Sequence, residues 1–122
     1  MPEEKKTVVC VEDEPEMIDL VKLILGRKGF ELVGAVGGRE GLETVRKLKP
    51  DLVLLDLMMP EETGTGLYRK LHDKKAYKEI PVIVISGAAG RDVAVSKSVP
   101  VFDKPIDKEA LLSKIQETVG AA

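Results

Sequence analysis

The sequence predicts a single α/β domain in which helices cover both faces of a mostly parallel β-sheet. Short apolar runs rich in β-branched residues alternate with stretches in which apolar residues recur at helical spacing, a pattern typical of βαβ crossovers. The short runs are continuously apolar, which indicates strands that are buried on both faces. A length of 122 residues suits one hydrophobic core, so we expect residues 1–122 to form one domain.

Five segments have the composition and length of strands. They are residues 7–11, 31–36, 52–55, 82–85 and 99–102. Parallel strands need long crossover connections, usually helices, and the intervals between these segments are long enough to supply them. The sequence therefore predicts five strands alternating with five helices.

The expected helices each present an apolar face. The residues that share such faces are Met17, Val21, Ile24 and Leu25; Leu42, Val45 and Leu48; Leu67 and Leu71; and Leu111, Ile115 and Val119. Boundary signals agree with these helices. Pro15 suits the first turn of the first helix, Gly29 follows that helix, and Pro50 follows the second.

Charge and hydropathy argue against several classes of protein. The chain has 19 Lys and Arg against 21 Asp and Glu, and it lacks the basic run expected of a direct nucleic-acid or membrane-surface partner. The charged N-terminal segment has no signal-peptide core, and the apolar runs are too short to span a membrane. The single cysteine, Cys10, cannot form an internal disulfide. We therefore expect a cytoplasmic protein.

Polar side chains follow four of the five expected strands. They are Glu12 and Asp13 after the first, Asp56 after the third, Ser86 after the fourth, and Asp103 and Lys104 after the fifth. Each one alone has an ordinary explanation as a helix-terminal acid, a turn residue or a surface lysine. Because ligands of open parallel sheets bind outside the carboxyl ends of the strands, the joint pattern indicates a site.

The residue types at these strand ends favour phosphoryl chemistry with a divalent cation. Carboxylates clustered at Glu12, Asp13 and Asp56 would repel one another unless a cation neutralised them, and oxygen-only ligands favour Mg²⁺. A lysine and a hydroxyl, at Lys104 and Ser86, would suit the oxygens of a phosphoryl group. One carboxylate could then act as the nucleophile towards phosphorus. Phosphoryl transfer mostly requires positioning and charge neutralisation, which this set would supply.

Taken together, the motifs resemble the receiver domain of two-component response regulators over essentially the whole chain. The resemblance rests on VVCVEDEP, on DLVLLDLMMP with Gly64 eight residues beyond Asp56, on PVIVISG and on FDKPI. It implies a flavodoxin-like fold, which is a doubly wound five-stranded parallel sheet of strand order 2-1-3-4-5 with five helices.

The resemblance also implies functional roles. It makes Asp56 the acceptor of a phosphoryl group from a sensor histidine kinase or a histidine phosphotransfer protein. Ser86 and Lys104 would contact that group, so the chain would be a switch that catalyses only its own phosphorylation and dephosphorylation. The implied ligands of Mg²⁺ are Glu12, Asp13, Asp56 and the backbone carbonyl of Met58. A downstream protein partner and a phosphorylation-dependent homodimer are further implications.

Three features depart from the family pattern. Glu12 stands where an aspartate is commoner. The position three residues before Lys104, normally a switch aromatic, is Val101, and the adjacent Phe102 should point to the opposite face of the strand. The stretch from Ser86 to Lys104 is also about one helical turn shorter than usual. The phosphorylation site is therefore better supported than the usual aromatic switch.

Two other classes of function remain open. A phosphorylation-independent interaction module on the same fold would suit the altered switch region, although the complete set of acids, hydroxyl and lysine argues against it. A metal-dependent phosphatase with Asp56 as nucleophile, similar to haloacid dehalogenases, would need a second aspartate two residues later. That position is Met58.

Overall fold

The structure is a computed structural model that describes residues 6–56, 80–86, 101–103 and 107–120. Its elements are β1 (Thr7–Glu12), α1 (Pro15–Gly26), β2 (Glu31–Val36), α2 (Gly38–Leu48), β3 (Leu52–Asp56), β4 (Val82–Ser86), β5 (Val101–Asp103) and α4 (Lys108–Val119). None of the helices in these ranges is long and apolar enough to cross a membrane.

The five described strands form one sheet in the order β2-β1-β3-β4-β5, and every neighbouring pair is parallel. This agrees with the strand order implied by the resemblance. Three of the five expected helices lie within the described ranges. The segment around Leu67 and Leu71, and the segment between β4 and β5, lie outside them, so the count of five helices is not tested.

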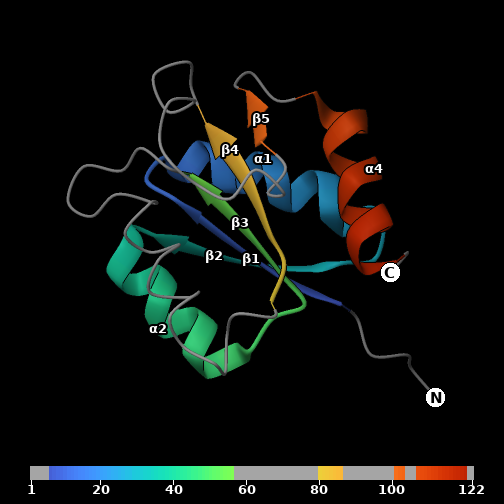
Figure 1. The fold of residues 1–122 in the computed structure, drawn as a ribbon. Helices are drawn as coiled ribbons and strands as arrows, with labels where there is room; N and C mark the ends of the chain where they lie inside the picture. The colour runs from blue at the N-terminus through green and yellow to red at the C-terminus, as the bar shows by residue number, and fades with distance from the viewer. Residues whose placement is uncertain (1–5, 57–79, 87–100, 104–106, 121–122) are drawn as a thin grey trace.

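Helices cover both faces of this sheet: α1 and α4 lie on one face and α2 on the other (Figure 1). Successive residues of each central strand therefore enter different cores, because strand side chains alternate between faces. The cluster towards α2 comprises Val9, Val11, Ala35, Val45, Val53, Leu55, Val82 and Val84. The cluster towards α1 and α4 comprises Val8, Cys10, Val21, Leu25, Phe30, Leu32, Leu52, Leu54, Ile83, Ile85, Leu111 and Ile115. Burial on both faces explains why the strands are continuously apolar.

In the three described helices, α1, α2 and α4, the predicted apolar faces are confirmed with one exception. Val21 and Leu25 of α1, Val45 of α2, and Leu111 and Ile115 of α4 are buried. Leu48 was expected on the buried face of α2, but its side chain is 42% exposed. Leu48 has the helical spacing of the buried face, which Gly38, Gly41 and Val45 form, so the periodicity is not the cause of the failure. Leu48 is the last residue of the helix and lies at the margin of that face.

Hydrogen bonds between residues distant in sequence connect the starts of β1 and β3 and the end of α4. The backbone N–H of Thr7 donates to Oδ2 of Asp51 at 2.8 Å, and the N–H of Asp51 donates to the Thr7 carbonyl at 2.8 Å. The Nζ of Lys6 donates to the carbonyl of Val119 at the end of α4. The starts of β1 and β3 are thereby aligned, and the end of α4 is fixed beside them.

The end of α2 carries a backbone conformation that suits glycine better than lysine. Lys49, which follows the helix, has φ 48° and ψ 65°, and its N–H donates to the Val45 carbonyl at 2.9 Å. A side chain in this left-handed region meets steric resistance that glycine does not. The helix therefore ends at a position where glycine is normally favoured.

We predict that Lys49→Gly raises the free energy of unfolding by about 0.5–1 kcal/mol. The matched control is Lys47→Gly, an equally exposed lysine inside α2, which should lower it by about 1 kcal/mol. Urea denaturation followed by circular dichroism measures both. A loss of stability in Lys49→Gly would contradict this account of the helix end.

A glycine in the edge strand allows α1 to approach the sheet closely. A Cβ placed on Gly34 would lie 2.4 Å from Cγ2 of Ile18 and 3.3 Å from its Cδ1. A contact of 2.4 Å is shorter than Cβ atoms make in folded proteins, so Ile18 would have to shift. Gly34 pairs with Cys10 of β1, which carries the acidic site at its end, so the packing of α1 here lies beside the strand that positions the site.

We expect Gly34→Ala to lower the free energy of unfolding by about 1–3 kcal/mol through this overpacking. Ile18→Ala removes the side chain that the new methyl group would meet, so the double variant should be less destabilised than the sum of the single variants. A double-mutant cycle measured by chemical denaturation tests this. Strict additivity would show that the contact between these residues is not the cause.

Candidate functional site

The acidic residues of the site come from adjacent, parallel strands. Val11 of β1 is in register with Leu55 of β3, and Glu12 and Asp56 are the next residues of the two strands. Because both strands run in the same direction, their last residues reach the same edge of the sheet. Asp13 follows Glu12 directly, in the turn between β1 and α1.

This arrangement gathers three carboxylates in a small volume. One carboxylate oxygen from each of Glu12, Asp13 and Asp56 lies within 4.8 Å of the other two. Glu12 is only 1% exposed and Asp56 only 3% exposed, whereas Asp13 is half-buried. Burial of ionised carboxylates is unfavourable unless they are paired, hydrogen-bonded or bound to a metal. Three carboxylates gathered within this distance are a donor set that could hold a metal ion.

A hydrogen bond inside the cluster orients Glu12. Its Oε2 accepts the backbone N–H of Asp13 at 3.1 Å. Glutamate is one methylene longer than aspartate, and this bond holds the end of the longer side chain beside the backbone of the next residue. The orientation brings the Glu12 carboxylate into the group with Asp13 and Asp56.

The donor set fits a hard divalent cation. Mg²⁺ binds oxygen ligands at about 2.0–2.1 Å, so two of its ligands can be at most about 4.2 Å apart. The three carboxylate oxygens lie within 4.8 Å of one another, which is compatible with all three binding one ion. Carboxylate oxygens are the ligands that Mg²⁺ prefers. Glu12, Asp13 and Asp56 are thus suited to hold it.

Of the other predicted site residues, the structure describes only the backbone of Ser86. β4 ends at Ser86, whose neighbour Ile85 is in register with Asp56, so the backbone of Ser86 lies one residue beyond Asp56 at the same edge. Ser86 itself pairs with Asp103 at the end of β5. Met58 and Lys104 lie outside the described residues. The structure thus brings the three acids together and places the end of β4 beside them.

Phe102 lies on the inner side of β5. It is half-buried and packs against the cluster on the α1 and α4 face. This agrees with the expectation that Phe102 does not replace the aromatic that the family usually has at the position of Val101.

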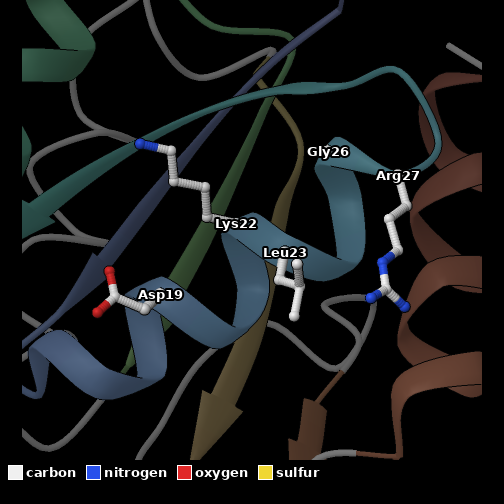
Figure 2. A pocket seen from close by; sticks show the side chains of 5 residues that line it. All are labelled: Asp19, Lys22, Leu23, Gly26 and Arg27. Atoms are coloured by element: carbon white, nitrogen blue, oxygen red, sulfur yellow. The ribbon is translucent and has the colours of Figure 1, made fainter.

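A shallow hollow on the outer side of α1 was not anticipated from the sequence. Figure 2 shows the side chains that line it, which belong to Asp19, Lys22, Leu23, Gly26 and Arg27. Leu23 is 55% exposed. Leu23 does not share the helical spacing of the apolar face of α1. This spacing could have indicated from the sequence that its side chain is exposed. The hollow does not include the acidic cluster, so it adds nothing to the phosphoryl chemistry considered above.

The fold and the acidic edge correspond to one family. The response regulator receiver domain matches residues 8–116, and the chain belongs to this family. Receiver domains are signalling switches of two-component systems rather than classical enzymes. They bind Mg²⁺ at an acidic pocket and interact with histidine kinases or phosphotransfer proteins and with downstream effectors.

Among curated relatives, protein Rrf1 of Nitratidesulfovibrio vulgaris is 25% identical over 113 residues, which cover 93% of this chain and 82% of Rrf1. The transcriptional regulatory protein CseB of Streptomyces avermitilis is 33% identical over 93% of this chain but only 48% of its own length. The response regulator GtcR of Aneurinibacillus migulanus is 38% identical over 71% of this chain and 34% of its own length. This chain thus spans about half or less of these two regulators.

Solved structures agree on the fold. Response regulator protein TrrA of Thermotoga maritima, solved in complex with Mg²⁺ and BeF, has a TM-score of 0.83 and 27% identity, with coverage of 93% of this chain and 98% of TrrA. The chemotaxis protein CheY4 of Vibrio cholerae has a TM-score of 0.80 and 23% identity, with coverage of 94% of this chain and 99% of CheY4. The similarity to CheY4 concerns the fold alone.

We predict that Mg²⁺ stabilises the folded chain through the acidic cluster. At a concentration ten times its dissociation constant, a ligand that binds only the folded state adds about 1.4 kcal/mol to the free energy of unfolding. Asp13→Asn, which removes one charge from the cluster, should weaken this gain. The gain is measured as the shift in thermal midpoint between EDTA and MgCl₂.

The matched control for this prediction is Asp51→Asn, the same substitution at the opposite end of β3. Asn can still accept the hydrogen bond from Thr7. This variant should keep the full response to Mg²⁺. An equal loss in both variants would point to general charge screening instead of a metal bound at the cluster.

Proposed function

We propose that this chain accepts a phosphoryl group on Asp56 from a sensor histidine kinase or a histidine phosphotransfer protein, and that it changes conformation to signal to a partner protein. The residues assigned to the reaction are Asp56 as acceptor, Ser86 and Lys104 as contacts of the phosphoryl oxygens, and Glu12, Asp13, Asp56 and the Met58 carbonyl as ligands of Mg²⁺. Membership of the receiver family and the cluster of three carboxylates both support this proposal.

The observation that carries the proposal is the grouping of three carboxylates at one edge of the sheet, two of them nearly inaccessible to solvent. A buried carboxylate is a better nucleophile than a hydrated one because less water must be removed before it attacks. Asp56 ends β3, the central strand of the sheet, and its segment DLVLLDLMMP resembles the phosphoacceptor segment of the family. This argues for Asp56 as acceptor and for Glu12 and Asp13 as ligands.

The transfer itself is a displacement at phosphorus. One carboxylate oxygen of Asp56 forms the new P–O bond as the P–N bond to the donor histidine breaks, and a proton restores the neutral imidazole of the donor. Mg²⁺, when bound, neutralises charge on the phosphoryl oxygens. The hydroxyl of Ser86 and the ammonium of Lys104 are suited to donate hydrogen bonds to the same oxygens. The product is an aspartyl phosphate.

Several wider assignments belong to the same proposal. We assign residues 1–122 to one receiver domain and the chain to the cytoplasm, where histidine kinases present their phosphoryl groups. We propose no direct contact with nucleic acid or membrane, because acidic and basic residues are nearly balanced. A homodimer that forms on phosphorylation is one route by which the signal could be read.

The two alternatives have less support. A phosphorylation-independent module would not require the full set of acids, hydroxyl and lysine that the sequence places at the strand ends. A phosphatase of the haloacid dehalogenase type lacks the second aspartate, since Met58 occupies its position. The phosphorylation experiment described next should give a different result under each of these two alternatives.

We predict that incubation with acetyl phosphate and Mg²⁺ adds one phosphoryl group to the chain, detected by intact-protein mass spectrometry. Asp56→Asn should abolish the adduct because an amide oxygen is a much weaker nucleophile than a carboxylate. Addition of EDTA should reduce the adduct strongly, since Mg²⁺ would no longer neutralise the phosphoryl charge.

Asp51→Asn is again the control, because it changes an exposed aspartate at the other end of the same strand. It should be phosphorylated as well as the wild type. An adduct that persists in Asp56→Asn would assign the phosphoryl group to another residue. Release of inorganic phosphate from small phosphate esters would instead revive the phosphatase.

A further inference from the structure

We infer that Glu40 is a guard residue, whose carboxylate keeps the free edge of β2 from pairing with β2 of a second copy of this chain. The inference concerns the edge strand of the sheet, and it does not rest on the proposed phosphorylation.

The outer side of β2 carries a row of backbone groups. β2 is the outermost strand of the sheet, and of the described strands only β1 pairs with it (Figure 1). The N–H of Glu31 donates to the carbonyl of Lys6, the residue before β1, at 3.0 Å, so Glu31 points its backbone groups towards β1. Because these groups alternate in direction along a strand, those of Leu32, Gly34 and Val36 point away from β1. Such a row is a template for another strand.

The side chains of β2 give this edge little protection. Its sequence is ELVGAV, so only its first residue carries a charge. Gly34 is exposed, and the apolar side chain of Val36 is 50% exposed. The register with β1 runs from Glu31 to Val36 without interruption, so there is no bulge. Natural edge strands are usually protected by charges, prolines or bulges, and β2 has none of these after its first residue.

Glu40 supplies the protection from the neighbouring helix. It lies in the first turn of α2, and its Oε2 accepts the backbone N–H of Val36. A glutamate at this position of a helix commonly accepts the N–H of the N-cap residue, which here is Gly37. The bond of Glu40 reaches one residue further back, onto the edge strand. The carboxylate thus occupies the last outward N–H of β2 and places a negative charge beside it.

A second copy of β2 fits this edge because the row of backbone groups is self-complementary. In an antiparallel register centred on Gly34, the two Gly34 residues exchange both hydrogen bonds, and Leu32 of each copy lies opposite Val36 of the other. Each Val36 N–H would then donate to a Leu32 carbonyl. This is the N–H that Glu40 holds, so the bond to Glu40 and the pairing exclude each other. An apolar pair across the strands would also cover the exposed Val36.

The test compares three variants of the whole 122-residue chain. Glu40→Ala removes the acceptor of the Val36 N–H, whereas Glu40→Gln keeps an oxygen acceptor without the charge. Asp107→Ala is the matched control, because Asp107 also accepts a backbone N–H near the start of a helix, that of Ala110 in α4. Sedimentation equilibrium measures the dissociation constant of any dimer. Amide hydrogen exchange followed by NMR locates the surface that becomes protected.

We expect the dimer of Glu40→Ala to have a dissociation constant at least about tenfold lower than that of the wild type, because a hydrogen bond to a charged group no longer competes with pairing. The amides of Leu32 and Gly34 should exchange more slowly as the concentration of this variant rises. Glu40→Gln should associate less than Glu40→Ala, and Asp107→Ala should behave as the wild type. In the monomeric wild type, the Val36 amide should exchange more slowly than the Gly34 amide, a measurement that needs no variant to fold.

Four results would overturn the inference. Glu40→Ala could associate no more than the wild type, or Asp107→Ala could associate equally, which would indicate general loosening of the fold. Association could leave the amides of Leu32 and Gly34 unprotected, which would assign it to another surface. Equal exchange of the Val36 and Gly34 amides in the wild type would show that Glu40 does not hold the edge.

Discussion

The in-register, parallel pairing of β1 with β3 is the constraint on which the rest of the structure depends. It brings the last residues of both strands, Glu12 and Asp56, to one level at one edge of the sheet. Apolar residues on both faces bury these strands, so the two acids lie at the ends of buried strands and not in an exposed loop. Together with Asp13 they form an oxygen donor set that could hold a divalent cation, which the proposed phosphoryl transfer would use.

Helix packing and hydrogen bonds support the pairing of β1 with β3. Gly34 lets Ile18 approach β2, so α1 lies close to the sheet beside the strand that carries Glu12. Asp51 and Thr7 align the starts of β1 and β3, and Lys6 fixes the end of α4 near them. Hydrogen bonds thus hold the amino edge of the sheet, opposite the edge at which the acidic cluster lies.

The fold class and the acidic site could be predicted because both depend on periodicity and on strand ends. Continuous apolar strands implied a sheet covered on both faces, and the acids after the first and third strands implied the cluster of Glu12, Asp13 and Asp56. Leu48 was misplaced because helical spacing does not reveal where a helix leaves the sheet. The contact of Gly34 with Ile18 and the bond from Lys6 to Val119 join residues distant in sequence, so no local pattern indicates them.

The central claim is that this geometry selects Asp56, among three neighbouring acids, as the phosphoryl acceptor. Borohydride reduces an aspartyl phosphate to homoserine, which marks the modified residue permanently. After incubation with acetyl phosphate and Mg²⁺, reduction and proteolysis, tandem mass spectrometry locates the mark. The account predicts homoserine at position 56 alone. Homoserine at position 13, a reduced glutamyl phosphate at position 12, or no reduced residue in a chain that carries a phosphoryl group would contradict it.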